Sequence, residues 1–270
     1  MKRAAFIQTL GLMVVAAAGW EEGKGKKLPV AGESFELGGR EAFLIRPKEE
    51  KGAKGEKAEK DGMPWVWYAP TLPGLPGVEE RWLFEQLLAS GIGIAGIDAG
   101  ESYGSPDGRK VYDLLYAELT ERRGMGKRPV MLGRSRGGLM TLSWAAEHPE
   151  RCGGFAGIYP VCDLTSYPTV EKACGAYHLT ADGLRAVLKE HNPVDRLEGL
   201  AKAKVPFFAI HGDVDTVVPL ERNSGLVAER YRALGGEMEL VVPNGQGHNM
   251  WEGFFRSAEL VAFVKRAAGR

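Results

Sequence analysis

The residues best suited to covalent chemistry lie in one short stretch around Ser135. The sequence there is Gly133-Arg134-Ser135-Arg136-Gly137, a match to the pattern G-x-S-x-G. A serine hydroxyl is a weak nucleophile until a neighbouring base accepts its proton. The pattern is typical of a sharp turn between a strand and a helix that leaves the serine exposed. We therefore predict Ser135 as a nucleophile.

Two later stretches carry the residues that such a nucleophile needs. His248 ends a glycine-rich segment and is the predicted general base. A carboxylate must hold the imidazole in the required tautomer and stabilise its cation. Asp213 and Asp215 follow a short apolar run, and Asp163 follows the preceding one. The acid can come from any of these three.

The elements around these residues alternate between strand and helix. Apolar runs predict strands at residues 64–69, 92–97, 130–132, 154–161, 205–210 and 237–242. Helical patterns follow at residues 81–90, 107–123, 136–148, 220–234 and 251–268. A hairpin is predicted from Glu33–Leu37 and Arg40–Arg46 around Gly38-Gly39. The alternation predicts an α/β fold with a mostly parallel sheet of about eight strands and helices on both faces.

With these motifs the chain resembles α/β-hydrolase serine esterases and the catalytic domains of the prolyl-oligopeptidase type. The resemblance covers roughly residues 65–270 and includes the chain order Ser, Asp, His. His211-Gly212-Asp213-Val214-Asp215, followed by Val218-Pro219, matches the pattern His-Gly-x-x-Asp-x-x-Val-Pro. It implies an α/β-hydrolase fold with a catalytic triad of Ser135, Asp215 and His248.

The same resemblance indicates where an oxyanion would bind. One donor is the backbone amide of Arg136, and the other comes from the loop after the strand at residues 64–69. The family's usual His-Gly pair is absent, and Ala69-Pro70 stands in its place. Proline has no N–H to donate, so the amide of Thr71 is the predicted second donor and that of Leu72 the alternative. Residues 162–200 correspond to a small cap over the site.

The arginines beside the nucleophile are unusual. Ser135-Arg136 followed by Gly138 is locally similar to the Ser-Arg-x-Gly of glucuronoyl esterases. This implies that Arg136 stabilises the oxyanion or binds a substrate carboxylate, whereas the alternative is an ion pair with Asp98 or Glu101. For Arg134 the ion pair is the preferred interpretation. Tyr103 and Trp251 are further candidates for substrate binding.

Composition limits the classes of partner. Lys+Arg and Asp+Glu number 35 each among 270 residues, so the formal net charge is zero. No overall field attracts nucleic acid or an anionic membrane. The cysteines and histidines do not have metal-site spacing, and no metal or organic cofactor is implied.

The N-terminal residues have the pattern of an export signal. Met1-Lys2-Arg3 precedes an apolar stretch with small residues at its end, which predicts a signal peptide over residues 1–18 and a secreted or periplasmic protein. Residues 19–270 then form a single domain. In an oxidising compartment Cys162 and Cys174 could pair. The charged stretch 48–61 is interpreted as a solvated loop.

Three functions are compatible with the sequence. The preferred one is a serine carboxylesterase acting on short acyl esters, including acetyl or other esters on carbohydrates. A prolyl-oligopeptidase-type peptidase is the second, although neither a preceding propeller nor a paired-glutamate segment is evident. A non-catalytic hydrolase-like binding protein is the third, and the presence of Ser135, Asp215 and His248 together argues against it.

Overall fold

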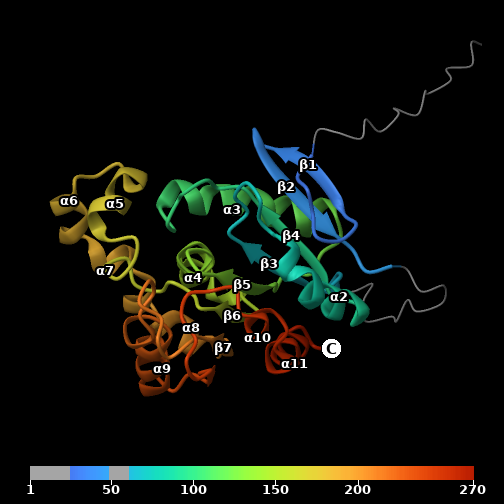
Figure 1. The fold of residues 1–270 in the computed structure, drawn as a ribbon. Helices are drawn as coiled ribbons and strands as arrows, with labels where there is room; N and C mark the ends of the chain where they lie inside the picture. Colours follow the sequence, from blue (N-terminus) through green and yellow to red (C-terminus); the bar gives the residue numbers. More distant parts are fainter. Residues whose placement is uncertain (1–24, 49–60) are drawn as a thin grey trace, which may run out of the picture.

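The structure is a computed structural model that describes residues 25–48 and 61–270 (Figure 1). Within them, eight strands form one sheet in the order β1-β2-β4-β3-β5-β6-β7-β8. β2 pairs with β1 and β4 in antiparallel fashion, and every other pairing is parallel. The predicted mostly parallel α/β-hydrolase sheet is therefore confirmed. The predicted signal peptide and nearly all of the charged stretch 48–61 lie outside the described residues.

The strands are short, and the central ones are buried on both faces. β3, β4, β5 and β6 are almost entirely buried, as expected for parallel strands covered by helices on both sides. The eight strands are β1 (Glu33–Leu37), β2 (Arg40–Ile45), β3 (Trp65–Ala69), β4 (Gly93–Ile97), β5 (Val130–Arg134), β6 (Gly154–Ile158), β7 (Phe207–Ile210) and β8 (Met238–Val241).

One face of the sheet is covered by helices from the two ends of the domain. These are α2 (Arg81–Ala89), α10 (Glu252–Phe255) and α11 (Ala258–Ala267). Phe84 of α2 and Phe263 of α11 pack there against Val66 and Phe208 of the sheet. Burying such side chains stabilises the fold by about 1.5–3 kcal/mol each.

The opposite face is covered by α3 (Pro106–Ala117), α4 (Gly137–Glu147), α8 (Glu198–Lys202) and α9 (Ser224–Ala233). Trp67 of β3 packs here against Tyr112 of α3 and Trp144 of α4, with ring centroids 4.9 and 4.8 Å away. The side chain of Ser105 caps α3 by accepting a hydrogen bond from the amide of Gly108.

Short helices make up most of residues 162–200. They are α5 (Val170–Ala173), η4 (Cys174–Tyr177), α6 (Ala181–Ala186), α7 (Leu188–His191) and η5 (Pro193–Asp195). Figure 1 shows α5 to α7 at the edge of the molecule, beside α3 and α4. Their apolar side chains form a small cluster of their own with Leu139 of α4 and Val218. We call residues 162–200 the cap segment.

Several predicted helices are broken in the structure. The helix expected at residues 107–123 continues beyond α3 as a π-helix, η2 (Glu118–Arg122). The one expected at residues 220–234 starts as η6 (Leu220–Arg222) before α9 begins. The last one divides into α10 and α11, and Ser257 caps the second part through the amide of Leu260. The remaining short helices are η1 (Val78–Glu80) and η3 (Pro149–Arg151).

No helix in the described part of the chain combines the length and the apolar character needed to cross a bilayer.

Candidate active site

Ser135 lies in the turn between β5 and α4, where its backbone has a φ of +50°. This left-handed conformation costs a non-glycine residue about 1–2 kcal/mol. The carbonyl of Ser135 accepts hydrogen bonds from the amides of Gly138 and Val161, which fix the turn. Gly137 is required by close approach, because a Cβ there would overlap the carbonyl oxygen of Ala69 at the end of β3. The start of α4 thus packs directly on the neighbouring strand end.

His248 lies in the loop after β8 and meets the nucleophile. Its Nε2 is 2.9 Å from Oγ of Ser135, a hydrogen-bonding distance. The imidazole packs against the ring of Tyr159, which follows β6, with centroids 4.4 Å apart. Burial raises the pKa of Tyr159 to about 12, against the lowering effect of Arg134, so its hydroxyl stays neutral beside the histidine. No motif in the sequence singles out Tyr159.

Asp215 contacts the other nitrogen of His248. Its Oδ2 is 2.8 Å from Nδ1, while its Oδ1 accepts hydrogen bonds from the amides of Val217 and Val218. Burial favours the neutral acid, but hydrogen bonds from His211, His248 and the Val218 amide outweigh it and hold the pKa of Asp215 well below its usual value. The carboxylate is therefore ionised and oriented towards the imidazole.

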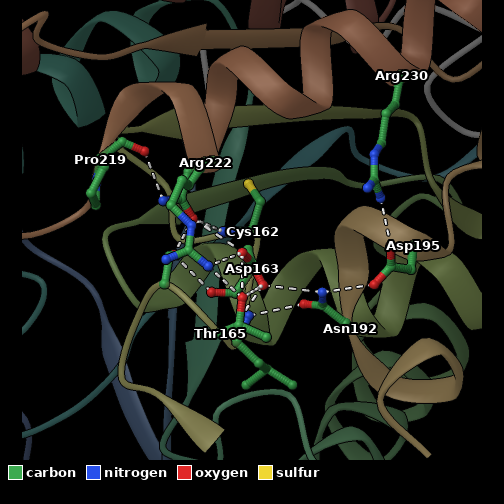
Figure 2. A network of polar contacts seen from close by, with 11 residues as sticks. Cys162, Asp163, Thr165, Asn192, Asp195, Pro219, Arg222 and Arg230 are labelled. Atoms are coloured by element: carbon green, nitrogen blue, oxygen red, sulfur yellow. Dashed lines mark hydrogen bonds and ion pairs between the residues drawn. The ribbon is translucent and has the colours of Figure 1, made fainter. Parts of the chain in front are cut away.

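The other two acid candidates point elsewhere. Asp213 accepts a hydrogen bond from the amide of Gly245 and so joins the loops that carry Asp215 and His248. Figure 2 shows Asp163 in a polar network with Thr165, Asn192 and Arg222. That network joins the start of the cap segment to the loop before α9. Neither carboxylate has a hydrogen bond or ion pair with His248 in the described part of the chain.

His211 lies next to Asp215. It is fully buried, and its Nε2 lies 2.8 Å from the carbonyl oxygen of Val218 and 3.4 Å from Oδ2 of Asp215. A carbonyl can only accept, so this nitrogen carries the proton. Nδ1 is 2.8 Å from Oγ of Ser224 at the start of α9. His211 is thus held by local hydrogen bonds next to Asp215.

The candidate oxyanion donors lie where β3 ends against α4. Thr71 is buried, and its hydroxyl donates to the carbonyl of Tyr68. Among the described residues, the amides of Thr71, Leu72 and Arg136 meet no acceptor. The contact between Gly137 and Ala69 brings the two chain segments together. The arrangement thus leaves N–H groups on both sides of the turn free to bind an oxygen.

Arg136 forms an ion pair with Glu101, which lies in the loop between β4 and α3. Both side chains are partly exposed. Tyr103 lies in the same loop, and burial followed by the charge of Glu101 raises its pKa. Asp98 instead accepts a hydrogen bond from the amide of Gly100. Of the two acids considered for Arg136, the structure selects Glu101.

Arg134 has a different partner from those predicted. Its Nη1 lies 2.6 Å from Oε1 of Glu80, a fully buried carboxylate in η1, so the predicted pairing with Asp98 or Glu101 is wrong for this residue. Oε1 also accepts from the hydroxyl of Tyr68. The other terminal nitrogen of Arg134 is 3.1 Å from Sδ of Met250, two residues after His248. This arginine therefore links η1 to the histidine loop.

Trp251 lies on the outer rim of the same loop. It is 41% exposed, and one edge packs against Phe254 in a T-shaped contact. Tyr103 and Trp251, the two aromatic candidates for substrate binding, thus come from different loops. Tyr103 lies in the loop between β4 and α3 that also carries Glu101, and Trp251 lies in the loop after β8 that carries His248.

The cysteines form no disulfide. Cys152, Cys162 and Cys174 have free thiols, and the pairing considered for Cys162 with Cys174 is not present. Each sulfur instead lies near a local carbonyl, that of Gly154 for Cys152, that of Pro160 for Cys162 and that of Glu171 for Cys174. Within residues 25–48 and 61–270, no group of three or more His, Cys, Asp and Glu side chains could hold a metal ion.

Comparison with known structures gives many α/β-hydrolases. A puromycin-hydrolyzing peptidase from Mycobacterium tuberculosis has a TM-score of 0.67 at 17% identity, over 88% of this chain and 39% of that one. An S-formylglutathione hydrolase from Agrobacterium tumefaciens has a TM-score of 0.64 at 19% identity, over 89% and 94%. Est1E from Butyrivibrio proteoclasticus has a TM-score of 0.61 at 16% identity, over 89% and 100%. These likenesses show the fold, and the chain spans about two fifths of the peptidase's length.

Sequence comparison assigns the family. No curated protein matches the chain significantly. The model of the prolyl oligopeptidase family matches residues 116–270, more than half of the chain. That region contains Ser135, Asp215 and His248. The match supports a serine hydrolase and does not distinguish esters from peptides as substrates. The chain belongs to the prolyl oligopeptidase family and has the α/β-hydrolase fold.

Proposed function

We propose that this protein is a serine carboxylesterase that cleaves short acyl esters through an acyl-enzyme. The observation that carries the proposal is the continuous chain of hydrogen bonds from Ser135 through His248 to Asp215, with links of 2.9 and 2.8 Å. Ser135 is the nucleophile, His248 its base and Asp215 the acid that orients the imidazole. The substrate is a small-molecule or carbohydrate ester, and the protein is exported.

The reaction follows from the geometry. His248 Nε2 accepts the proton of Ser135 as Oγ attacks the ester carbonyl, and Asp215 stabilises the imidazolium that forms. The amides of Arg136 and Thr71 bind the developing oxyanion, and a single such donor is worth about 3 kcal/mol of barrier height. The imidazolium then protonates the leaving alcohol. Water, activated by the same histidine, releases the acyl group in a second round.

The side chains at the rim support an ester with a sugar or other polar alcohol. Arg136 and Glu101 form a partly exposed ion pair beside the nucleophile. An arginine there can bind a carboxylate or add to the stabilisation of the oxyanion. Tyr103 and Trp251 offer ring faces against which a sugar can pack.

A peptidase of the prolyl-oligopeptidase type is the second candidate, because the matching family and one of the similar solved structures carry the names of peptidases. Rates with p-nitrophenyl acetate, butyrate and octanoate, beside a prolyl p-nitroanilide, distinguish the two. We expect ester cleavage that falls as the acyl chain lengthens and is lost in Ser135→Ala. Cleavage of the anilide alone would make the protein a peptidase, and cleavage of neither would contradict both candidates.

A further inference from the structure

Next to the loop that carries Glu101 and Tyr103 lies a group of polar side chains from three parts of the chain, some buried and some partly exposed. We call it the two-arginine cluster. Its members are Arg109 of α3, Ser143 and Glu147 of α4, His191 of α7 and Arg196, which follows η5. Ser143 and Glu147 are four residues apart and so lie on one face of α4. α4 packs against both α3 and η5, which brings the members together.

One carboxylate oxygen serves both arginines of the cluster. Oε1 of Glu147 is 2.8 Å from Nε of Arg109 and 3.6 Å from Nη2 of Arg196. The side chain of Arg109 is only 7% exposed and that of Arg196 is 19% exposed. Two largely buried guanidinium groups thus share a single counter-charge, which is itself 33% exposed. The cluster therefore has a deficit of negative charge, and such a deficit is costly because a buried charge without full compensation is destabilising.

Several donors of the cluster have no acceptor. Arg196 Nη1, His191 Nδ1 and Ser143 Oγ are buried and have no hydrogen-bond partner among the described residues. Arg109 Nε, although close to Glu147, is not aligned for a hydrogen bond. Guanidinium groups donate only, while imidazole and hydroxyl groups can donate as well. The group that completes the cluster must therefore be an acceptor.

The neighbouring arginines also affect the pKa values of two members of the cluster. Burial, and then the charge of Arg109, lowers the pKa of Arg196. Burial, followed by both arginines, lowers the pKa of His191, so the imidazole is neutral near pH 7. The arginine charges thus add to the effect of burial in both shifts, and an anion among these groups would offset that part.

We propose that the two-arginine cluster binds a small anion, either chloride or a small carboxylate, between Arg109, Arg196 and His191. The anion accepts hydrogen bonds from the guanidinium groups and the imidazole and supplies the missing negative charge. It joins the cap segment, through His191 and Arg196, to α3 and α4.

The site has a direct structural connection to the rim of the candidate active site. Arg109 Nη1 donates to the carbonyl of Gly104 at 2.6 Å, and the hydroxyl of Tyr177 donates to the carbonyl of Tyr103 at 2.9 Å. Tyr177 also packs against the imidazole of His191, with ring centroids 5.1 Å apart. The bound anion therefore stabilises the backbone of the loop that carries Tyr103.

Thermal unfolding of the full chain tests the proposal without reference to catalysis. The midpoint is measured in sodium chloride, sodium acetate and sodium gluconate at equal ionic strength. We expect a higher midpoint in chloride or acetate than in gluconate, rising with the concentration of the anion, because a ligand that binds only the folded state stabilises it. Whichever of the two raises the midpoint identifies the source. Equal midpoints in all three salts would overturn the proposal.

Variants test whether the anion that stabilises the protein binds at the two-arginine cluster. Arg196→Gln is expected to weaken the apparent affinity for the anion at least about tenfold, since it removes a charged donor. Arg185→Gln, in an exposed ion-paired arginine of the cap segment, is the matched control and should respond as the wild type does. An unchanged response in Arg196→Gln would overturn the site. If that variant does not fold, the anomalous signal of bromide in crystals of the wild type decides. Density away from Arg109 and Arg196 would contradict the assignment.

Discussion

Nη1 of Arg134 lies 2.6 Å from Oε1 of Glu80, so the residue before the nucleophile is tied to a carboxylate that has no exposure to solvent. Oε2 of Glu80 accepts from the amide of Gly77, and Oε1 also accepts from the hydroxyl of Tyr68. Every acceptor oxygen thus has a donor. The pair fixes η1 against the end of β5, directly beside Ser135.

Removing the charge of Glu80 should strongly destabilise the fold. Glu80→Gln leaves Arg134 partly buried without a counter-charge, and breaking such a pair costs about 3–5 kcal/mol. The free energy of unfolding in urea, followed by tryptophan fluorescence, measures this. Glu85→Gln, at an exposed position on α2, is the control and should stay within about 0.5 kcal/mol of the wild type. A loss of that small size in Glu80→Gln would contradict the role of the pair.

The acid assignment predicts unequal effects of three isosteric substitutions. Asp215→Asn should lower kcat about 10⁴-fold, because the amide cannot hold the required tautomer of the base or stabilise its cation. Asp213→Asn keeps an acceptor for the amide of Gly245, and Asp163→Asn lies in a separate polar network, so both should retain most of the activity. Steady-state ester hydrolysis by folded protein measures all three. A severe loss confined to Asp213→Asn or Asp163→Asn would reassign the acid.

The ionisation of Asp215 predicts how stability depends on pH. Its pKa in the folded state is depressed below the value of about 3.9 expected in the unfolded chain. Its contribution to stability is therefore fully present above pH 4 or so and is lost as the pH falls towards the folded-state pKa. Urea unfolding between neutral and acidic pH should show a shallower decline in Asp215→Asn than in the wild type. Parallel curves would show that protonation of Asp215 does not cause the loss of stability at acidic pH.

Two roles of the Arg136 side chain can be separated by kinetics. If it binds a substrate carboxylate, Arg136→Met should raise KM about 10–100-fold for an ester that carries one and leave simple acetates unaffected. If it stabilises the oxyanion, kcat should fall for every ester. Glu101→Gln, which frees the guanidinium from its ion pair, should lower KM for the carboxylate substrate only in the first case. Unchanged kinetics for all substrates would show that the side chain of Arg136 has neither role and only pairs with Glu101.

The fold was predictable from the sequence because its signals are local. Alternating apolar runs and helical patterns gave the parallel sheet, and the G-x-S-x-G stretch and the His-Gly-x-x-Asp stretch identified the loops at the ends of β5 and β7. The cap that Ser105 forms on α3 is a local feature of the same kind, since the capping oxygen and the amide of Gly108 are three residues apart.

Contacts between distant loops were not predictable in the same way. Glu80 lies 54 residues before Arg134, and its short helix had no pattern that singled it out. Asp98 and Glu101 are nearer in sequence, yet of these two only Glu101 pairs with an arginine of the turn, and that arginine is Arg136. Tyr159 packs on His248 through the position of the residue after β6, which a pattern of residue types does not specify.

The breaks within the predicted helices come from side-chain hydrogen bonds, which a helical pattern of residue types does not reveal. Ser257 is an ordinary residue in a helical pattern, but its hydroxyl caps a new helix and so divides the last one. η6 precedes α9 where Asn223, fully buried, uses its side chain to accept hydrogen bonds from the amides of Cys162 and Asp163. At Asn223 these tertiary contacts override the local helical preference.

The most direct test of the central claim is covalent trapping of the nucleophile. A fluorophosphonate reacts with a serine that a neighbouring base activates, and mass spectrometry of the digested protein identifies the modified residue. We predict one adduct on the peptide that contains Ser135, absent in Ser135→Ala and greatly slowed in His248→Ala. No adduct on folded wild-type protein, or an adduct that persists in Ser135→Ala, would contradict the assignment of Ser135 as an activated nucleophile.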